Sequence, residues 1–463
     1  MIQKKHFNTT AYYLLLIIAF GIGTQTVLYK VGIIFLLFLW LFSSSLKETI
    51  NELRLNKQIV SLILVYVLYV VSFLWSTDIS FAYKDLLLKS PLLLFPLIFS
   101  SIRLSKIQFL NVILIFVIAS FLINLASIIN SFFIFLHTND LNSFYYQQLT
   151  INIHSAYQAT ITCFSICCII YLKHKGFKIN DLIFYFFVFF QALIILLLSS
   201  RMQILIMAII APVFIISRYS MSKQFFKGLI YSLIVLLSSY LFINIPSSSL
   251  KFRYAQSKKT VSNIALDVKY KHTEPRGLIW RHGIEVIKDN FFIGTGVGDA
   301  KNELVKKYKK EIIKKDNIVP AIDSISNAIK KDPNALRYLA NNNPYKEIKQ
   351  QENKIKEFAK RILKRNNYVY TNFSKKKYNF HNQFLQTFAT VGLTGFLLLM
   401  YFIFSTAHRA FYVRDYLSLA FIFIISFSLV TESMLERHTG VSFFSFFAFF
   451  LTMLNPKSLY KSF

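Results

Sequence analysis

Long apolar segments recur along most of this chain and limit what it can fold into. A helix of about 20 residues rises ~1.5 Å per residue and so crosses the ~30 Å hydrocarbon core of a bilayer. Hydrophobic residues make up 55% of the chain, which is more than a soluble domain of about 45–50% carries. We therefore predict an all-α polytopic membrane protein with about twelve transmembrane helices. The predicted segments are residues 11–24, 27–43, 58–75, 86–101, 109–136, 152–172, 182–198, 202–216, 226–245, 383–406, 411–430 and 439–455.

The first apolar segment follows the basic sequence MIQKKH. No small-x-small cleavage site follows it, so we interpret it as a retained helix rather than a signal peptide. The segment 86–101 contains Pro91 and Pro96 and is among the least regular of the series. The three cysteines all lie in the segment 152–172, where we expect core packing rather than disulfides or a zinc site.

Lysine and arginine are distributed unequally between alternate connections. If the N-terminus is cytoplasmic, most of them fall on the cytoplasmic side, as the positive-inside rule requires. Both termini are then predicted to be cytoplasmic. The cytoplasmic connections hold Lys4, Lys5, Lys47, Arg54, Lys57, Arg103, Lys106, Lys173, Lys175, Lys178, Arg218, Lys223, Lys227, Arg409, Arg414, Lys457 and Lys461, and the short outer ones hold Lys30, Lys84, Lys89, Arg201 and Arg437.

One long hydrophilic segment interrupts the apolar pattern. It carries 30 Lys plus Arg against 13 Asp plus Glu, and long segments translocate largely regardless of charge. We therefore predict helices 1–9 in residues 1–245, a large outer loop at 246–378, and helices 10–12 in residues 379–463. Two lysine-rich stretches of this loop, KNELVKKYKKEIIKK and KEIKQQENKIKEFAKRILKR, have helical spacing. Such charges are usually solvated, and attraction to anionic headgroups or substrates is the alternative.

The stretch HNQFLQTFATVGLTG, residues 381–395, begins where this charged loop meets an apolar segment. On a continuous helix Gly392 lies about 20° from His381 in projection, and Gly395 about 40° to the other side. We therefore expect all three on one face. Small residues there let a neighbouring helix approach closely, which would fix the direction of His381. An interfacial histidine beside a packing motif is the alternative.

His381-Asn382, nine residues and Gly392-x-x-Gly395 resemble the signature of the bacterial O-antigen ligase and O-antigen polymerase family. The position is similar too, between a large loop and a late helix. The resemblance implies a GT-C-like glycosyltransferase in the bacterial inner membrane, with its loop and active site facing the periplasm. It implies an undecaprenyl-diphosphate-linked glycan as donor and a lipid A-core or another lipid-linked glycan as acceptor. Residues 300–378 are longer and richer in lysine than is usual for the family.

Arg201 is the single charge between two apolar segments, in LIILLLSSRMQILIMAII. An arginine at the membrane edge is costly and usually has a partner. Snorkelling to lipid headgroups is the alternative. The sequence is similar to the family here, where Ser-Arg starts a helix, and this implies that Arg201 binds the diphosphate of the donor.

The stretch PRGLIWRHGIEVIKDNFFIGTGVGD, residues 275–299, opens with proline, which suits a first helical position. Arg276 and Trp280 share one face, and the apolar spacing predicts a helix on the membrane surface. The family has a similar Arg…Trp segment before a glycine-rich turn, so Arg276 matches its essential loop arginine and Arg281 is the second choice. GTGVGD follows no predicted strand, so we do not interpret it as a nucleotide site.

Other polar residues gather in the connections predicted to lie outside. Each suits either a structural or a substrate-binding role. The candidate substrate contacts are Lys89, His154, Tyr157, Trp280, Arg281, Asn382 and Glu432, with Glu436 beside the last.

The resemblance implies an inverting displacement at the anomeric carbon. Arg201 and Arg276 would hold the diphosphate and stabilise developing charge. His381 would accept the acceptor's proton or orient its hydroxyl. The chain has no Asp-x-Asp pair, so we expect no metal and no cofactor. Ligase is favoured over polymerase because the His-to-Gly spacing is intact.

Two rival functions belong to other classes. A transporter or flippase for anionic lipids would need ionisable groups and broken helices near the bilayer midplane. The predicted segments are nearly free of charge there. A purely structural membrane anchor is the weaker rival. The expected partners are therefore membrane lipids and the two lipid-linked glycans, with no nucleic acid.

Overall fold

The computed structural model describes residues 4–43, 46–54, 56–151, 153–210, 275–312, 317–331 and 348–454. Helix accounts for 84% of the structure, and no strand occurs in the described ranges. The all-α prediction is confirmed. The predicted helix at 226–245, the end of the one at 202–216 and the boundary at residue 245 lie outside the described residues.

The described helices form three groups along the chain. The first group is α1 (Lys4–Thr24), α2 (Leu28–Ser43), α3 (Leu46–Arg54), α4 (Lys57–Val71), α5 (Ile79–Lys89), α6 (Pro91–Phe99), α7 (Lys106–Thr138), α8 (Tyr146–Leu149), α9 (Ser155–His174), α10 (Asp181–Leu197) and the helix Arg201–Ile210, with short 3-10 helices at Ser72–Trp75 and Leu141–Phe144. The second is α14 (Pro275–Asp289), α15 (Ala300–Lys310), α16 (Ile318–Lys331) and α18 (Ile348–Lys376). The third is α19 (Gln383–Tyr412), α20 (Tyr416–Thr431) and α21 (His438–Met453), with a 3-10 turn at Met434–Glu436.

Five described helices are long and apolar enough to cross a membrane. They are His6–Thr24, Lys57–Trp75, Lys106–Thr138, Ser155–His174 and Gln383–Tyr412. Shorter apolar helices accompany them at Leu28–Phe42, Asp181–Leu197, Arg201–Ile210, Tyr416–Thr431 and His438–Met453. Together these helices support a polytopic membrane protein.

The predicted helix at 86–101 has the wrong bounds. The chain forms α5, which starts at Ile79, and then α6, which starts at Pro91. Asp78 caps α5 by accepting a hydrogen bond from the Phe81 N–H at 3.0 Å. Pro91 has no N–H to give to α5 and suits the first position of a new helix, so the proline separates the two.

Aromatic packing places α21 in the core of the bundle. Its phenylalanines are almost fully buried. Phe450 stacks on Phe109 of α7 with ring centroids 4.6 Å apart, and Phe446 meets Phe95 of α6 edge to face at 5.6 Å. In lipid, such close packing replaces the hydrophobic effect as the force that holds helices together.

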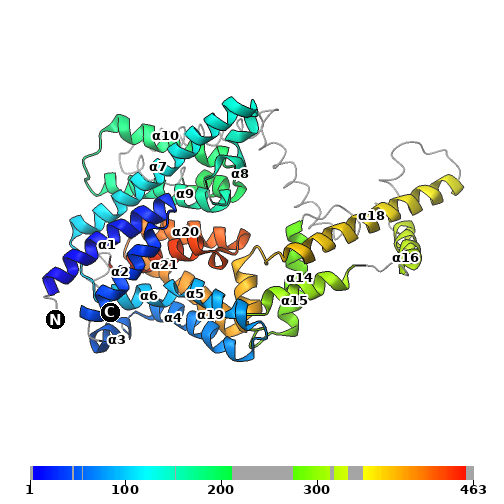
Figure 1. The fold of residues 1–463 in the computed structure, drawn as a ribbon, viewed down its shortest axis with the longest axis horizontal. Coiled ribbons are helices and arrows are strands. Elements are labelled where there is room, and N and C mark those ends of the chain that lie inside the picture. Colours follow the sequence, from blue (N-terminus) through cyan, green and yellow to red (C-terminus); the bar gives the residue numbers. More distant parts are fainter. Residues whose placement is uncertain are drawn as a thin grey trace.

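Polar contacts hold the connections together at each of the two ends of the bundle. At one end, Arg103 donates its backbone N–H to Asn8 at 2.9 Å and pairs with Glu52 at 2.6 Å. At the other end, Asp299 accepts hydrogen bonds from Thr77. In Figure 1, α1 starts at the left and α14, α15 and α18 lie to the right.

The second group of helices packs around a small core that it shares with the start of α19. Ile279 and Val286 of α14 pack with Tyr308 of α15 and with Tyr370 and Phe373 of α18. From this core α18 runs outward to α16, away from the bundle (Figure 1). The helices predicted in the two lysine-rich stretches are confirmed by α15 and α18.

Candidate active site

The glycine-rich turn at 294–299 ties the hydrophilic segment to a membrane helix. The N–H groups of Thr295 and Gly296 donate to the carbonyls of Ala389 and Thr390 in α19, at 2.8 and 3.0 Å. A continuous helix would use those carbonyls for its own bonds, so α19 must be broken where the turn docks.

Gly392 provides that break. Its backbone has φ 69° and ψ −167°, a conformation that favours glycine. The Leu393 N–H, which a regular helix would give to residue 389, donates instead to the Phe291 carbonyl at 3.0 Å. A Cβ on Gly392 would lie 2.1 Å from the Phe292 carbonyl oxygen. Gly392 therefore lets the loop that was predicted to be periplasmic dock on α19, rather than letting a second helix approach.

The same turn also docks on the other side. The N–H groups of Val297 and Gly298 each donate at 3.1 Å, to the hydroxyls of Ser72 and Ser76 at the end of α4. The protein itself thus uses four consecutive N–H groups of GTGVGD. Their role is to anchor this segment.

The expectation that His381, Gly392 and Gly395 share one helix face is wrong. His381 has φ 46° and precedes the helix, which begins at Gln383. Asn382 caps the helix by accepting a hydrogen bond from the Leu385 N–H at 3.1 Å. The break at Gly392 then turns the chain, so the 100° spacing does not run through. A Cβ on Gly395 would lie 3.7 Å from a methyl of Leu68 in α4.

Glu432 joins two of the residues singled out in the sequence. Its Oε1 accepts a hydrogen bond from Nη2 of Arg276 at 2.6 Å, and its Oε2 lies 3.6 Å from Nδ1 of His381. The His381 side chain is 28% exposed and that of Glu432 12%. This separation is longer than a hydrogen bond, and Nδ1 of His381 is buried without a hydrogen-bond partner among the described residues.

Charges set the protonation of this cluster. Burial alone would raise the pKa of Glu432, but the His381 and Arg276 contacts outweigh burial and hold it below its ordinary value. Glu432 is therefore ionised at neutral pH. Burial lowers the pKa of His154, and the charges of Arg437, His381 and Arg276 add to this while Glu432 opposes it. His154 is therefore mostly uncharged at neutral pH.

The connection between α20 and α21 is held by the start of α19. Ser433 accepts a hydrogen bond from the Asn382 N–H through its hydroxyl at 3.2 Å and from the Tyr157 hydroxyl through its carbonyl at 3.3 Å. Gln383 accepts the Leu435 N–H at 2.8 Å. These contacts fix the position of Glu432 against His381, and they place Asn382 and Tyr157 as supports of the cluster.

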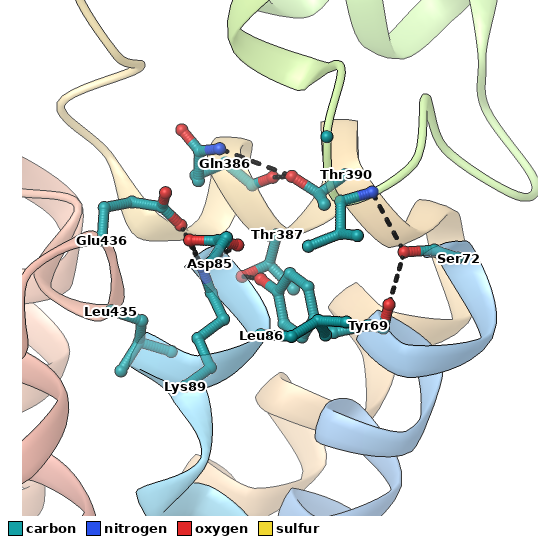
Figure 2. Close-up of polar contacts among 12 residues, drawn as sticks. Tyr69, Ser72, Asp85, Leu86, Lys89, Gln386, Thr387, Thr390, Leu435 and Glu436 are labelled. Carbon is teal, nitrogen blue, oxygen red and sulfur yellow. Dashed lines mark hydrogen bonds and ion pairs between the residues drawn. The ribbon is translucent and has the colours of Figure 1, made fainter. Parts of the chain in front are cut away.

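A buried lysine holds the other end of the same connection. Lys89 is fully buried, and its Nζ donates to Asp85 at 2.6 and 2.5 Å and to Glu436 at 2.8 Å. Figure 2 shows Lys89 reaching up between Asp85 and Glu436, with Thr387 and Tyr69 beside it. The sequence placed Lys89 in an outer connection as a substrate contact, but in the structure both carboxylates cover its charge.

A cavity of about 930 Å³ opens beside these groups. Asp85, Glu436, His154 and Tyr157 are part of its wall. The full lining is Phe81, Lys84, Asp85, Leu87, Leu88, Gln147, Ile153, His154, Tyr157, Lys301, Asn379, Glu436, Arg437, His438 and Thr439.

Arg201 lies at the same end of the bundle. It begins its helix directly after Ser199 and Ser200, and Gln203 in the first turn donates to Thr160 of α9 at 2.8 Å and to Ser428 of α20 at 3.0 Å. Glu432 follows Ser428 by one helical turn. The helix that carries Arg201 thus starts next to the helices that carry His154 and Glu432.

Arg281 and Trp280 lie apart from the Glu432 cluster. Arg281 donates to the Tyr370 hydroxyl of α18 at 3.0 Å. Trp280 packs against the small core of α14, α15 and α18. Of the two arginines weighed from the sequence, Arg276 is the one that reaches Glu432.

Sequence reasoning missed Asp85, Ser433 and Asp299. Asp85 stands four residues before Lys89, the spacing of an ion pair on a helix, and that was the available signal. Asp299 was read only as the end of GTGVGD. Nothing in the pattern around Ser433 marks its role.

The comparisons with known proteins bear on the segment that carries the arginines. The family model described as O-antigen ligase matches residues 186–322, which include Arg201, Arg276, Trp280 and Arg281. His381, Asn382, Gly392 and Gly395 lie beyond the match. No curated protein matches the chain. Over these residues, the domain match supports the resemblance to the O-antigen ligase family.

Proposed function

We propose that this chain transfers a glycan from a polyprenyl diphosphate, of the undecaprenyl type, to a lipid A-core acceptor. The observation that carries the proposal is the Arg276–Glu432–His381 arrangement, which lies close to His154 in the lining of a large cavity. One carboxylate accepts a hydrogen bond from an arginine, which suits an anionic leaving group, and lies 3.6 Å from a histidine, which suits proton removal from a hydroxyl.

The proposed reaction is a direct displacement without a metal or cofactor. His381 takes the proton of the acceptor hydroxyl on Nε2, and the hydroxyl oxygen forms the new bond at the anomeric carbon. The bond from that carbon to the diphosphate breaks, and the anomeric configuration inverts. Arg276 uses one N–H group on Glu432 and has others to stabilise the departing diphosphate, together with Arg201.

The placement of the ionisable groups favours a transferase over a flippase. Glu432, His381, Lys89 and Arg276 belong to one end of the bundle, where a flippase would want charges along the path through the membrane. A polymerase of the same family would use the same cluster with a second lipid-linked glycan as acceptor. Offering the purified protein each acceptor separately decides between ligase and polymerase.

The arginine roles have a direct test. Arg276→Lys keeps the charge but loses the planar fork that grips a carboxylate and a phosphate together. Losing one charge-assisted hydrogen bond should lower transfer by about 10-fold, and Arg201→Lys should act similarly. Transfer is measured with purified protein in nanodiscs, a polyprenyl-diphosphate glycan and a lipid A-core acceptor.

Arg361→Lys is the matched control for this test, because Arg361 is exposed on α18 and 3.7 Å from Glu357. It should leave transfer unchanged. Full transfer by Arg201→Ala and Arg276→Ala would exclude diphosphate binding by these two residues.

We also propose a periplasmic site in the bacterial inner membrane, with both termini cytoplasmic. The native cysteines are all buried, so single cysteines can be introduced without background. An impermeant thiol reagent should label Ser324→Cys on α16, and should not label Lys178→Cys, in cells with a permeabilised outer membrane. Labelling of position 178 without inner-membrane lysis would reverse the orientation.

A further inference from the structure

The cavity beside the Glu432 cluster carries three cations that the proposed reaction does not use. Lys84 comes from α5, Lys301 from α15 and Arg437 from the connection between α20 and α21. These residues are far apart in the sequence, and the fold brings all three into the lining of this cavity. Three cations that line one cavity make it attractive to an anion.

The position of Lys301 is set by the anchored turn. Asp299 accepts hydrogen bonds from the N–H and hydroxyl of Thr77 at 2.6 and 2.7 Å, and from the Asp78 N–H at 3.1 Å. Two residues later, Nζ of Lys301 lies 5.4 Å from the centre of the Phe81 ring. The hydrophilic segment therefore holds the charge of Lys301 against Phe81 of α5.

The carboxylates in the wall do not cancel these cations. Asp85 and Glu436 both accept hydrogen bonds from the buried Lys89. Among the ion pairs of the described residues, none joins the three cations to a carboxylate. With two carboxylates offset in part by Lys89, the wall favours an anion.

Apolar and neutral groups complete the cavity. Phe81, Leu87 and Leu88 offer an apolar side, and His154 lines the cavity close enough to Glu432 and His381 for their charges to alter its pKa. An anion bound here would lie next to the proposed reacting centre. A volume of about 930 Å³ is in the range of ligand sites of ~300–1,000 Å³.

Resting on the proposed function, we infer that this cavity is a phosphate subsite for a lipid-linked saccharide. Lys84, Lys301 and Arg437 contact the phosphate oxygens, and Phe81 and Leu87 contact the attached sugar or prenyl carbons. Two substrates of the reaction carry this chemistry: the donor through its diphosphate and the acceptor through the phosphates of its lipid A-core.

A triple variant tests this inference. Lys84→Gln, Lys301→Gln and Arg437→Gln together remove three charges, and Lys309→Gln, Lys310→Gln and Arg361→Gln remove the same number from exposed positions on α15 and α18. Binding of farnesyl diphosphate and of a phosphorylated lipid A-core is measured in nanodiscs without turnover. The cavity variant should bind one of the two at least about 10-fold more weakly than the exposed-site control, and wild-type binding should weaken with salt.

The two binding measurements distinguish the donor from the acceptor as the ligand of this subsite. Weaker binding of farnesyl diphosphate alone assigns the subsite to the donor, and weaker binding of the lipid A-core alone assigns it to the acceptor. Equal affinities of the two variants for both ligands would overturn the inference. If wild-type protein binds either ligand through these cations but transfers no glycan, the proposed function fails and the subsite stands. Should the triple variant not fold, Arg437→Gln with Arg361→Gln as its control answers the same question.

Discussion

His381→Ala should lower glycan transfer by about 100-fold or more, the usual range for a positioned acid–base group. The imidazole has Glu432 on its Nδ1 side at 3.6 Å, so alanine removes the proton acceptor and leaves the carboxylate and Arg276 paired. The protein should stay folded, because His381 precedes α19 and Asn382 still caps that helix. The turnover number is measured alongside the elution profile in detergent.

Gly392→Ala supplies the contrast. A Cβ there meets the Phe292 carbonyl and a positive φ, so the loop should detach from α19 and both stability and transfer should fall. The two variants thus separate a chemical role from a seating role. Near wild-type transfer by His381→Ala would remove the histidine from the reaction and leave Glu432 as the next candidate base.

Lys89→Met should destabilise the protein by about 3–5 kcal/mol. Lys89 is fully buried between Asp85 and Glu436, and its removal leaves two carboxylates without their counter-ion. The unfolding free energy can be followed by titration with sodium dodecyl sulfate, using the near-ultraviolet signal of the native state.

Two further variants make the Lys89 test specific. Lys89→Met with Asp85→Asn and Glu436→Gln removes all three charges and should recover most of the lost stability. Lys306→Met breaks an exposed pair with Glu303 on α15 and should cost no more than about 1 kcal/mol. If Lys89→Met unfolds at the same detergent fraction as the wild type, the buried network contributes nothing to stability.

Hydropathy and charge predicted the helical architecture because both follow from single residues and their neighbours. The apolar lengths found α4, α7, α9 and α19, and helical spacing found α15 and α18. The predicted helix bounds were wrong where a local signal was given too little weight, as at Pro91, which starts α6.

The site was only partly predictable. The motif drew attention to His381, and the arginine spacing to Arg276, but the link between them is Glu432, a residue 51 positions after His381 in the sequence. Backbone conformation was the other obstacle. The break at Gly392 comes with hydrogen bonds between α19 and Phe291 and Thr295, which no local pattern contains, and the positive φ of His381 was not predicted either.

The anchored turn at 294–299 has a consequence for how this chain can vary in length. The chain leaves the end of the bundle that carries the Glu432 cluster at Asp299, which accepts a hydrogen bond from Thr77. It returns at Asn382, which donates a hydrogen bond to Ser433. A connecting segment whose two ends are fixed can become longer at little entropic cost, since each doubling of the length of a flexible loop adds only about 0.6 kcal/mol to the free energy of loop closure. The chain between Tyr308 and Tyr370, which both belong to the small core, can therefore lengthen or shorten without moving the chemistry.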